Sequence, residues 1–141
     1  LYDHDPGGTT AIVVSPDGGT TKRTLDGRDY SRFGVLAMIS ALGTGGALTK
    51  LEIIASAAAD MSSPEVIKDS GTVDADAVGD QLFEECTVEE VADIATSSGK
   101  ALRYLAGRIT MDAADAECVV LYEGECPRFP RENLTPDSTI A

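Results

Sequence analysis

The sequence contains no tryptophan, only 5% aromatic residues and a single histidine, His4. Few aromatic rings argue against a site that stacks sugars or single-stranded nucleic acid on aromatic side chains. His4 stands near the start of the chain between Asp3 and Asp5, where a solvated side chain is more common than a metal ligand or a catalytic base. The sequence therefore predicts no catalytic residue, no cofactor and no metal site, and we expect a protein that is not an enzyme.

Positive charge is also scarce. The chain has 11 Lys and Arg residues and 24 Asp and Glu residues, which gives a net charge of −13. A chain this acidic is repelled by a phosphate backbone, so nucleic acid is not an expected partner. No apolar run approaches the roughly 20 residues that a membrane-spanning helix needs, so no membrane partner is expected either.

Cysteine is limited to Cys86, Cys118 and Cys126, an odd number without the close spacing of a zinc site or a disulfide framework. Buried thiols are the expected outcome. Cys86 follows Glu84 and Glu85, and these negative charges are expected to raise the pKa of its thiol, which disfavours a nucleophilic role.

The hydrophobic content of 43% in 141 residues is that of one globular domain with an aliphatic core. Two apolar runs, Phe33–Leu42 and Leu48–Ala55, are joined by the glycine-rich segment Gly43–Gly46. We predict that they pair as a β-hairpin. The first run is apolar on both faces, as in a central strand packed from two sides, whereas the second alternates and predicts one solvated face.

Further strands are predicted at Thr10–Ser15, Thr20–Leu25, Gln81–Glu85, Ala101–Met111 and Glu117–Glu123, with a short strand at Val66 and Ile67 inside a long connection from Ala57 to Gly79. The pattern Thr87-Val88-Glu89-Glu90 matches a capping box and predicts a helix over Val88–Ala95. Short strands with frequent turns and one helix predict a mainly β fold, an antiparallel β-sandwich of the jelly-roll type. The predicted domain covers residues 10–124, flanked by an N-terminal arm, 1–9, and a proline-containing C-terminal arm, 125–141.

Two segments invite more specific hypotheses. Arg128, Phe129, Pro130 and Arg131 place two cations around an aromatic ring, and Arg and Phe are favoured at interfaces, so these residues, together with Tyr2 of the N-terminal arm, are the candidate partner-binding residues. Asp74, Asp76 and Glu85 imitate the spacing of a calcium-binding loop, but no amphipathic helix precedes them, so an acidic surface loop is the preferred interpretation.

The order of several short motifs resembles that of small virion proteins of tailed bacteriophages. The motifs are Leu25–Arg32, Ala41–Gly46, Lys50–Glu52, Gly99–Leu105 and Tyr122–Gly124. This resemblance implies a decoration or cement protein on the outer surface of the virion head, which binds the major capsid protein and stabilises the shell, and which could itself form a homo-oligomer such as a trimer.

The residues alone leave other functions open. A rigid core with contact arms and an acidic surface fits a protein on the outside of a particle. Another virion component at the neck, tail or head fibre is one alternative. A carbohydrate-binding or adhesin-like β-sandwich module is the other.

Overall fold

The computed structural model describes residues 2–4, 12–13, 25–42, 48–112 and 117–127. For Tyr2–His4, Ile12–Val13, Leu25, Cys126 and Pro127 it describes the backbone only. The described chain is mainly β, with antiparallel strands and one helix, as the sequence predicts.

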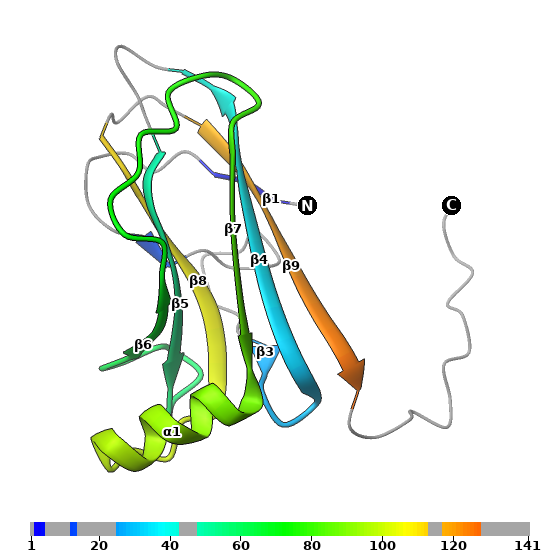
Figure 1. Ribbon diagram of the computed structural model, residues 1–141, viewed down its shortest axis with the longest axis vertical. Helices are drawn as coiled ribbons and strands as arrows, with labels where there is room; N and C mark the ends of the chain where they lie inside the picture. The colour runs from blue at the N-terminus through cyan, green and yellow to red at the C-terminus, as the bar shows by residue number, and fades with distance from the viewer. Residues whose placement is uncertain (1, 5–11, 14–24, 43–47, 113–116, 128–141) are drawn as a thin grey trace.

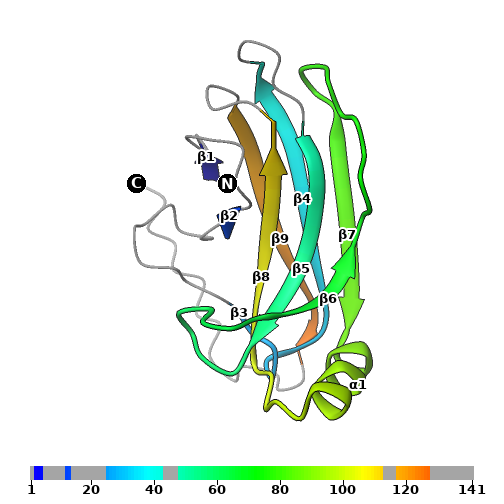
Figure 2. The same ribbon diagram turned by 90° about the vertical axis from the view of Figure 1, so that its left-hand side faces the viewer.

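The strands form two antiparallel sheets, seen as separate layers in Figures 1 and 2. Sheet A has the order β1-β9-β4-β7, and sheet B has the order β2-β8-β5-β6, with the short strand β3 also pairing with β8. The bounds are β1 Tyr2–His4, β2 Ile12–Val13, β3 Leu25–Asp26, β4 Tyr30–Ala41, β5 Leu48–Ser56, β6 Glu65–Asp69, β7 Gln81–Thr87, β8 Tyr104–Met111 and β9 Glu117–Pro127.

A single large core lies between the two sheets. Alternate side chains of each strand point into it, which is the two-residue period of β structure. Sheet A contributes Phe33, Val35, Ala37, Ile39, Cys86, Cys118 and Val120, and sheet B contributes Leu48, Leu51, Ile53, Ala55, Leu105, Ile109 and Met111. The predicted aliphatic core is therefore confirmed, and both Cys86 and Cys118 are buried.

The predicted hairpin between the two apolar runs is wrong. Both runs are strands, but β4 pairs with β7 and β9, whereas β5 pairs with β6 and β8. The inward rows of the two strands face each other across the core instead of sharing a ladder, and each row is fully buried at positions such as Val35 and Ile53. Hydrophobic periodicity indicates a strand and its buried face, but it does not identify the strand's neighbour.

The predicted solvated face of β5 is also wrong. Ile54 is fully buried there in a small cluster with Met61 and Ala106, because the connection after β5 folds back over this face. Glu52 is only 4% exposed. Its carboxylate accepts a hydrogen bond from Nε of Arg108 at 2.6 Å and forms an ion pair with Nζ of Lys50 at 3.2 Å. The burial of this acidic side chain is stabilised by two cations.

Helix α1, Val88–Ser98, begins where the sequence predicts. Both hydrogen bonds of the capping box are present: Thr87 N donates to Oε2 of Glu90 at 2.8 Å, and Glu90 N donates to Oγ1 of Thr87 at 3.4 Å. Gly99 follows the helix with a left-handed φ of 69°, which a glycine adopts without a steric penalty. The helix crosses one end of the two sheets and places Val91 in the core (Figure 1).

The predicted domain boundaries shift at both ends. Strand β9 continues to Pro127, which pairs with Tyr30, so the predicted C-terminal arm starts inside a strand. Proline is tolerated there because the described pairing of β1 covers only Cys118–Val120 of β9, so at Pro127 the strand lies at an edge, with β4 as its described neighbour. At the other end, Tyr2–His4 of the predicted N-terminal arm pairs with β9 as β1.

Candidate ligand pocket and exposed sheet face

A pocket opens at the end of the molecule where α1 crosses the two sheets. Its volume is about 200 Å³. Three separate segments build it: the turn from β3 into β4, the end of β7 with the first turns of α1, and the chain that leads into β8. Most of the lining is apolar, from Gly27, Tyr30, Phe33, Cys86, Val88, Val91, Ala92, Ala95, Leu102 and Leu105.

Three arginines also line the pocket, Arg28, Arg32 and Arg103, together with the hydroxyl-bearing residues Ser31 and Thr87. None of the described residues that line it carries a carboxylate, although acidic residues outnumber basic ones two to one in the whole chain. Among the described residues, guanidinium groups are therefore the charged groups of the lining.

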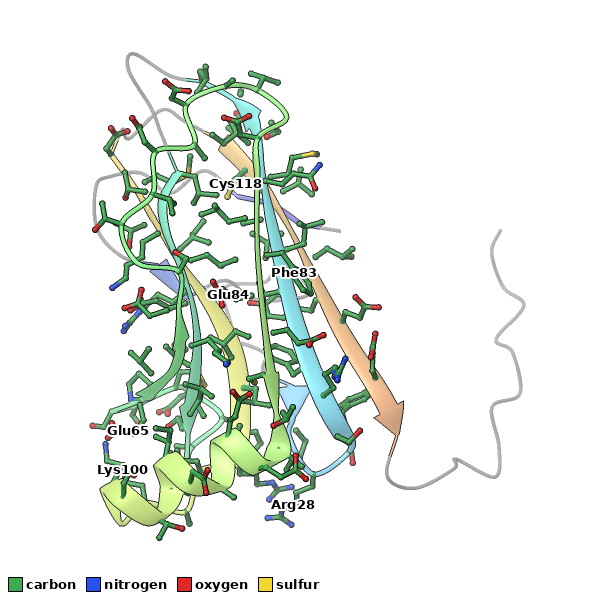
Figure 3. The ribbon with its side chains drawn as sticks, viewed as in Figure 1. Arg28, Glu65, Phe83, Glu84, Lys100 and Cys118 are labelled. Carbon is green, nitrogen blue, oxygen red and sulfur yellow. The ribbon has the colours of Figure 1, made fainter. Side chains whose placement is uncertain are left out.

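The three arginines differ in how they are paired. Arg103 Nε donates to Oδ2 of Asp26 at 2.9 Å, and its Nη2 approaches the same oxygen at 2.5 Å. These hydrogen bonds hold the pKa of Asp26 below its usual value. Arg32 forms ion pairs with Glu85 and Glu125 at 3.4 and 3.9 Å. Within the described chain Arg28 forms no ion pair, and Figure 3 shows it at the same end of the molecule as α1.

Cys86 contributes a sulfur atom to the pocket lining, and its side chain is almost fully buried. Burial raises the pKa of the Cys86 thiol to about 12, with Glu90 and Glu85 adding to the increase. The expected direction of the shift is confirmed, but burial is its main cause rather than the neighbouring acids. The thiol stays protonated at neutral pH and adds to the apolar lining.

A second candidate site lies on the outer face of sheet A. Leu36 of β4 stands opposite Phe83 of β7 on one side and opposite Leu121 of β9 on the other, so the three side chains form a row across the sheet. Phe83 is 52% exposed and Leu121 is 45% exposed. Figure 3 shows Phe83 midway along the sheet. Leu36 between them is half-buried. An apolar row with two exposed members of this size is a candidate interaction site.

The surroundings of this apolar row are mixed. The next row on one side contains Gln81, Met38 and Val119; Gln81 is exposed, and the other two side chains are half-buried. On the other side the cross-strand partners Glu85, Gly34 and Glu123 follow. The exposed face of sheet A thus has a mainly apolar half beside an acidic half.

Most of the predicted partner-binding residues lie outside the described residues: Arg128, Phe129, Pro130 and Arg131. For Tyr2 the structure gives the backbone, which pairs with Val120 in the register of β1 and β9. None of the five is brought to the pocket or to the apolar row by anything that the structure describes.

In the acidic loop before β7, a side-chain carboxylate binds backbone N–H groups of the same loop. Asp80 Oδ2 accepts hydrogen bonds from the backbone N–H groups of Asp76 and Ala77, at 3.2 and 3.1 Å. Glu85, the last position of the calcium-like pattern, belongs to β7 and pairs with Arg32. In the described part of the chain, no three His, Cys, Asp or Glu side chains are gathered in a way that could hold a metal ion.

Comparison of the sequence with protein-family models, and of the chain with curated proteins and solved structures, gives no match. Among the residues that the structure describes, no helix has the length and apolar character needed to cross a membrane.

Both sites were missed by sequence reasoning, for different reasons. The pocket joins residues from three separate segments of the chain, which sequence spacing alone does not bring together. A usable signal was that three of the 11 Lys and Arg residues, Arg28, Arg32 and Arg103, lie at or near the starts of predicted strands. For the sheet face, Leu36 and Met38 were recognised as a second apolar face of their strand, but this face was expected to be covered.

Proposed function

We propose that this chain is a decoration protein of a tailed-bacteriophage head, with a jelly-roll β-sandwich fold, which binds the major capsid protein on the outer surface of the shell and stabilises it. The exposed row Phe83–Leu36–Leu121 is the observation that carries the proposal, because it gives the chain a surface suited to binding another protein.

The strand order supports the jelly-roll part of the proposal. If the short strand β3 is set aside, eight described strands remain. When these eight are renumbered from 1 to 8 in chain order, sheet A has the order 1-8-3-6 and sheet B has the order 2-7-4-5. Such an order results when an antiparallel hairpin of four strand pairs is rolled up, so that each pair stays together and successive pairs alternate between the two facing sheets. Viral capsid and lectin domains are among the proteins built in this way.

Charge supports the outer surface as the location. A net charge of −13 disfavours contact with packaged DNA. The acidic half of the face, with Glu85 and Glu123, would also oppose the packing of two copies through this face, whereas a partner with basic residues beside an apolar patch would complement it. Many copies on one lattice would add avidity to a modest individual affinity.

The test is binding of the purified chain to capsids that lack it, measured by co-sedimentation and cryo-electron microscopy. We expect many lattice-ordered copies on the outer shell. Phe83→Ala is expected to weaken binding about 30-fold, because truncating a central aromatic at an interface costs about 2 kcal/mol. Val78→Ala is the matched control, since Val78 is 62% exposed in the loop before β7 and away from the apolar row.

Each other outcome points to a different conclusion. A few copies at one vertex would move the protein to the neck or tail. No binding by the unmodified chain would refute the decoration proposal, and specific binding on a glycan array would then favour the carbohydrate-binding alternative. Equal binding of the two variants would keep the function and reject the apolar row as its surface.

A further inference from the structure

We propose that the pocket beside α1 binds a small organic carboxylate with an apolar body, such as an aromatic ring on a short chain, whose carboxylate pairs with Arg28. This site does not depend on the sheet face or on the proposed capsid partner. The argument rests on the shape of the pocket, the chemistry of its lining and the pairing of its arginines.

The interior of the pocket selects for an apolar group. Val88, Val91 and Ala95 of α1 face Phe33 and Leu105 of the two sheets across it. A cavity of about 150 Å³ with an aliphatic and aromatic lining accommodates a benzene ring. The pocket here has about 200 Å³. It therefore has room for one ring and a short substituent, but not for a sugar chain or a nucleotide.

The sign of the charge on the ligand follows from the lining. Among the described residues, three arginines and no carboxylate line the pocket. Asp26, Glu85 and Glu125 pair with Arg103 and Arg32 from outside the lining, so the attraction for an anion comes from Arg28. A carboxylate on the ligand would find a planar guanidinium donor there.

Arg28 is the arginine that is available to bind the anion. Arg103 is engaged by Asp26, and Arg32 is engaged by Glu85 and Glu125. In the described residues every other Lys and Arg has an ion-pair partner, so Arg28 is the exception. Its backbone is fixed by the turn, because Arg28 N donates to Oδ1 of Asp26 at 3.1 Å. The turn thus places at an apolar pocket a guanidinium that has no ion-pair partner among the described residues.

The test is an NMR titration of the methyl-labelled full chain with 3-phenylpropanoate and, separately, with its neutral amide. We expect the carboxylate to cause saturable shifts confined to Val88, Val91, Leu102 and Leu105, and the amide to bind about tenfold more weakly, since it lacks the charge-assisted hydrogen bond. Arg28→Gln is expected to weaken binding of the carboxylate about tenfold and to leave binding of the amide unchanged.

Two further variants complete the test. Lys100→Gln removes the same charge from a residue that pairs with Glu65 and does not line the pocket, so we expect unchanged binding. Ala95→Leu fills the pocket with a side chain of similar helix propensity and is expected to abolish binding while the methyl spectrum stays folded. Shifts outside the pocket, equal affinity for acid and amide, or an Arg28→Gln variant that binds like the unmodified chain would each overturn the proposal.

Discussion

The variant Arg108→Met tests whether the buried carboxylate of Glu52, on the outer face of β5, depends on its neighbouring cations for stability. Glu52 is 4% exposed, and in Arg108→Met its carboxylate would keep only Lys50, which is shared with Asp69 at 2.8 Å. Breaking a buried ion pair by removing one partner costs about 3–5 kcal/mol, and the remaining lysine places this case near about 3 kcal/mol. Methionine retains much of the side-chain packing, so the loss isolates the charge.

The expected loss of unfolding free energy corresponds to a measurable fall in the melting temperature, Tm. With an unfolding entropy of about 2.1 cal/mol/K per residue, a chain of 141 residues has about 0.3 kcal/mol/K, and the Tm should fall by about 10 °C at pH 7. Replacing both partners, in Glu52→Met with Arg108→Met, should recover most of the loss, because no buried charge is left unpaired. Urea unfolding at pH 7 gives the corresponding free energies.

The pH dependence gives an independent check. Burial raises the pKa of Glu52, but hydrogen bonds from Arg108 and Lys50 together outweigh it, so the folded-state pKa lies below the usual value of a glutamate carboxyl. The stability from Glu52 is therefore present above the unfolded pKa and is lost as the pH falls through the folded pKa. Without Arg108 burial dominates and holds the pKa of Glu52 above its usual range, so the deficit of Arg108→Met should begin to shrink as the pH falls through that raised pKa and the buried carboxyl becomes neutral. A deficit under about 1 kcal/mol at pH 7, or a double variant no more stable than the single one, would refute this reasoning.

Three further predictions concern packing, capping and reactivity. Gly107→Ala should cost about 1–3 kcal/mol in urea unfolding, because its Cβ would lie 2.8 Å from Cγ1 of Val35, and adding Val35→Ala should cost less than the sum of the two changes. Thr87→Ala should cost about 1 kcal/mol by losing the bond from Glu90 N, and an unchanged midpoint would show that the cap is dispensable. Cys86 should react with iodoacetamide only as the chain unfolds, as measured by peptide mass spectrometry, and rapid native labelling would contradict its raised pKa.

Local signals in the sequence predicted local structure well. The capping box at Thr87 and Glu90 gave the start of α1 to the residue, because its two hydrogen bonds depend only on neighbours in the chain. The strand at Val66 and Ile67 is confirmed within β6, and the inward row of β9 at Cys118, Val120 and Tyr122 belongs to the core or packs against it.

Long-range arrangement was the part that the sequence did not reveal. A glycine-rich connection such as Gly43–Gly46 is compatible with a hairpin or with a crossing between two sheets, and only the rest of the core distinguishes them. The alternation of Lys50 and Glu52 predicted a solvent-exposed face of β5. Met61, which follows β5 in the chain, nevertheless helps to cover that face at Ile54. The pocket and the apolar row depend on the same kind of distant pairing.

Side chains of β4 point alternately into the core and to the outer face of sheet A, so neighbouring residues serve different purposes: core packing on one face and surface contact on the other. Val35 is fully buried between the sheets, whereas Leu36 lies in the outer row with Phe83 and Leu121. Adjacent side chains of a strand point to opposite faces, so a substitution in the outer row leaves the inner packing in place. The outer face of sheet A can therefore be redesigned, by evolution or in the laboratory, for a new partner while the same folded scaffold is kept.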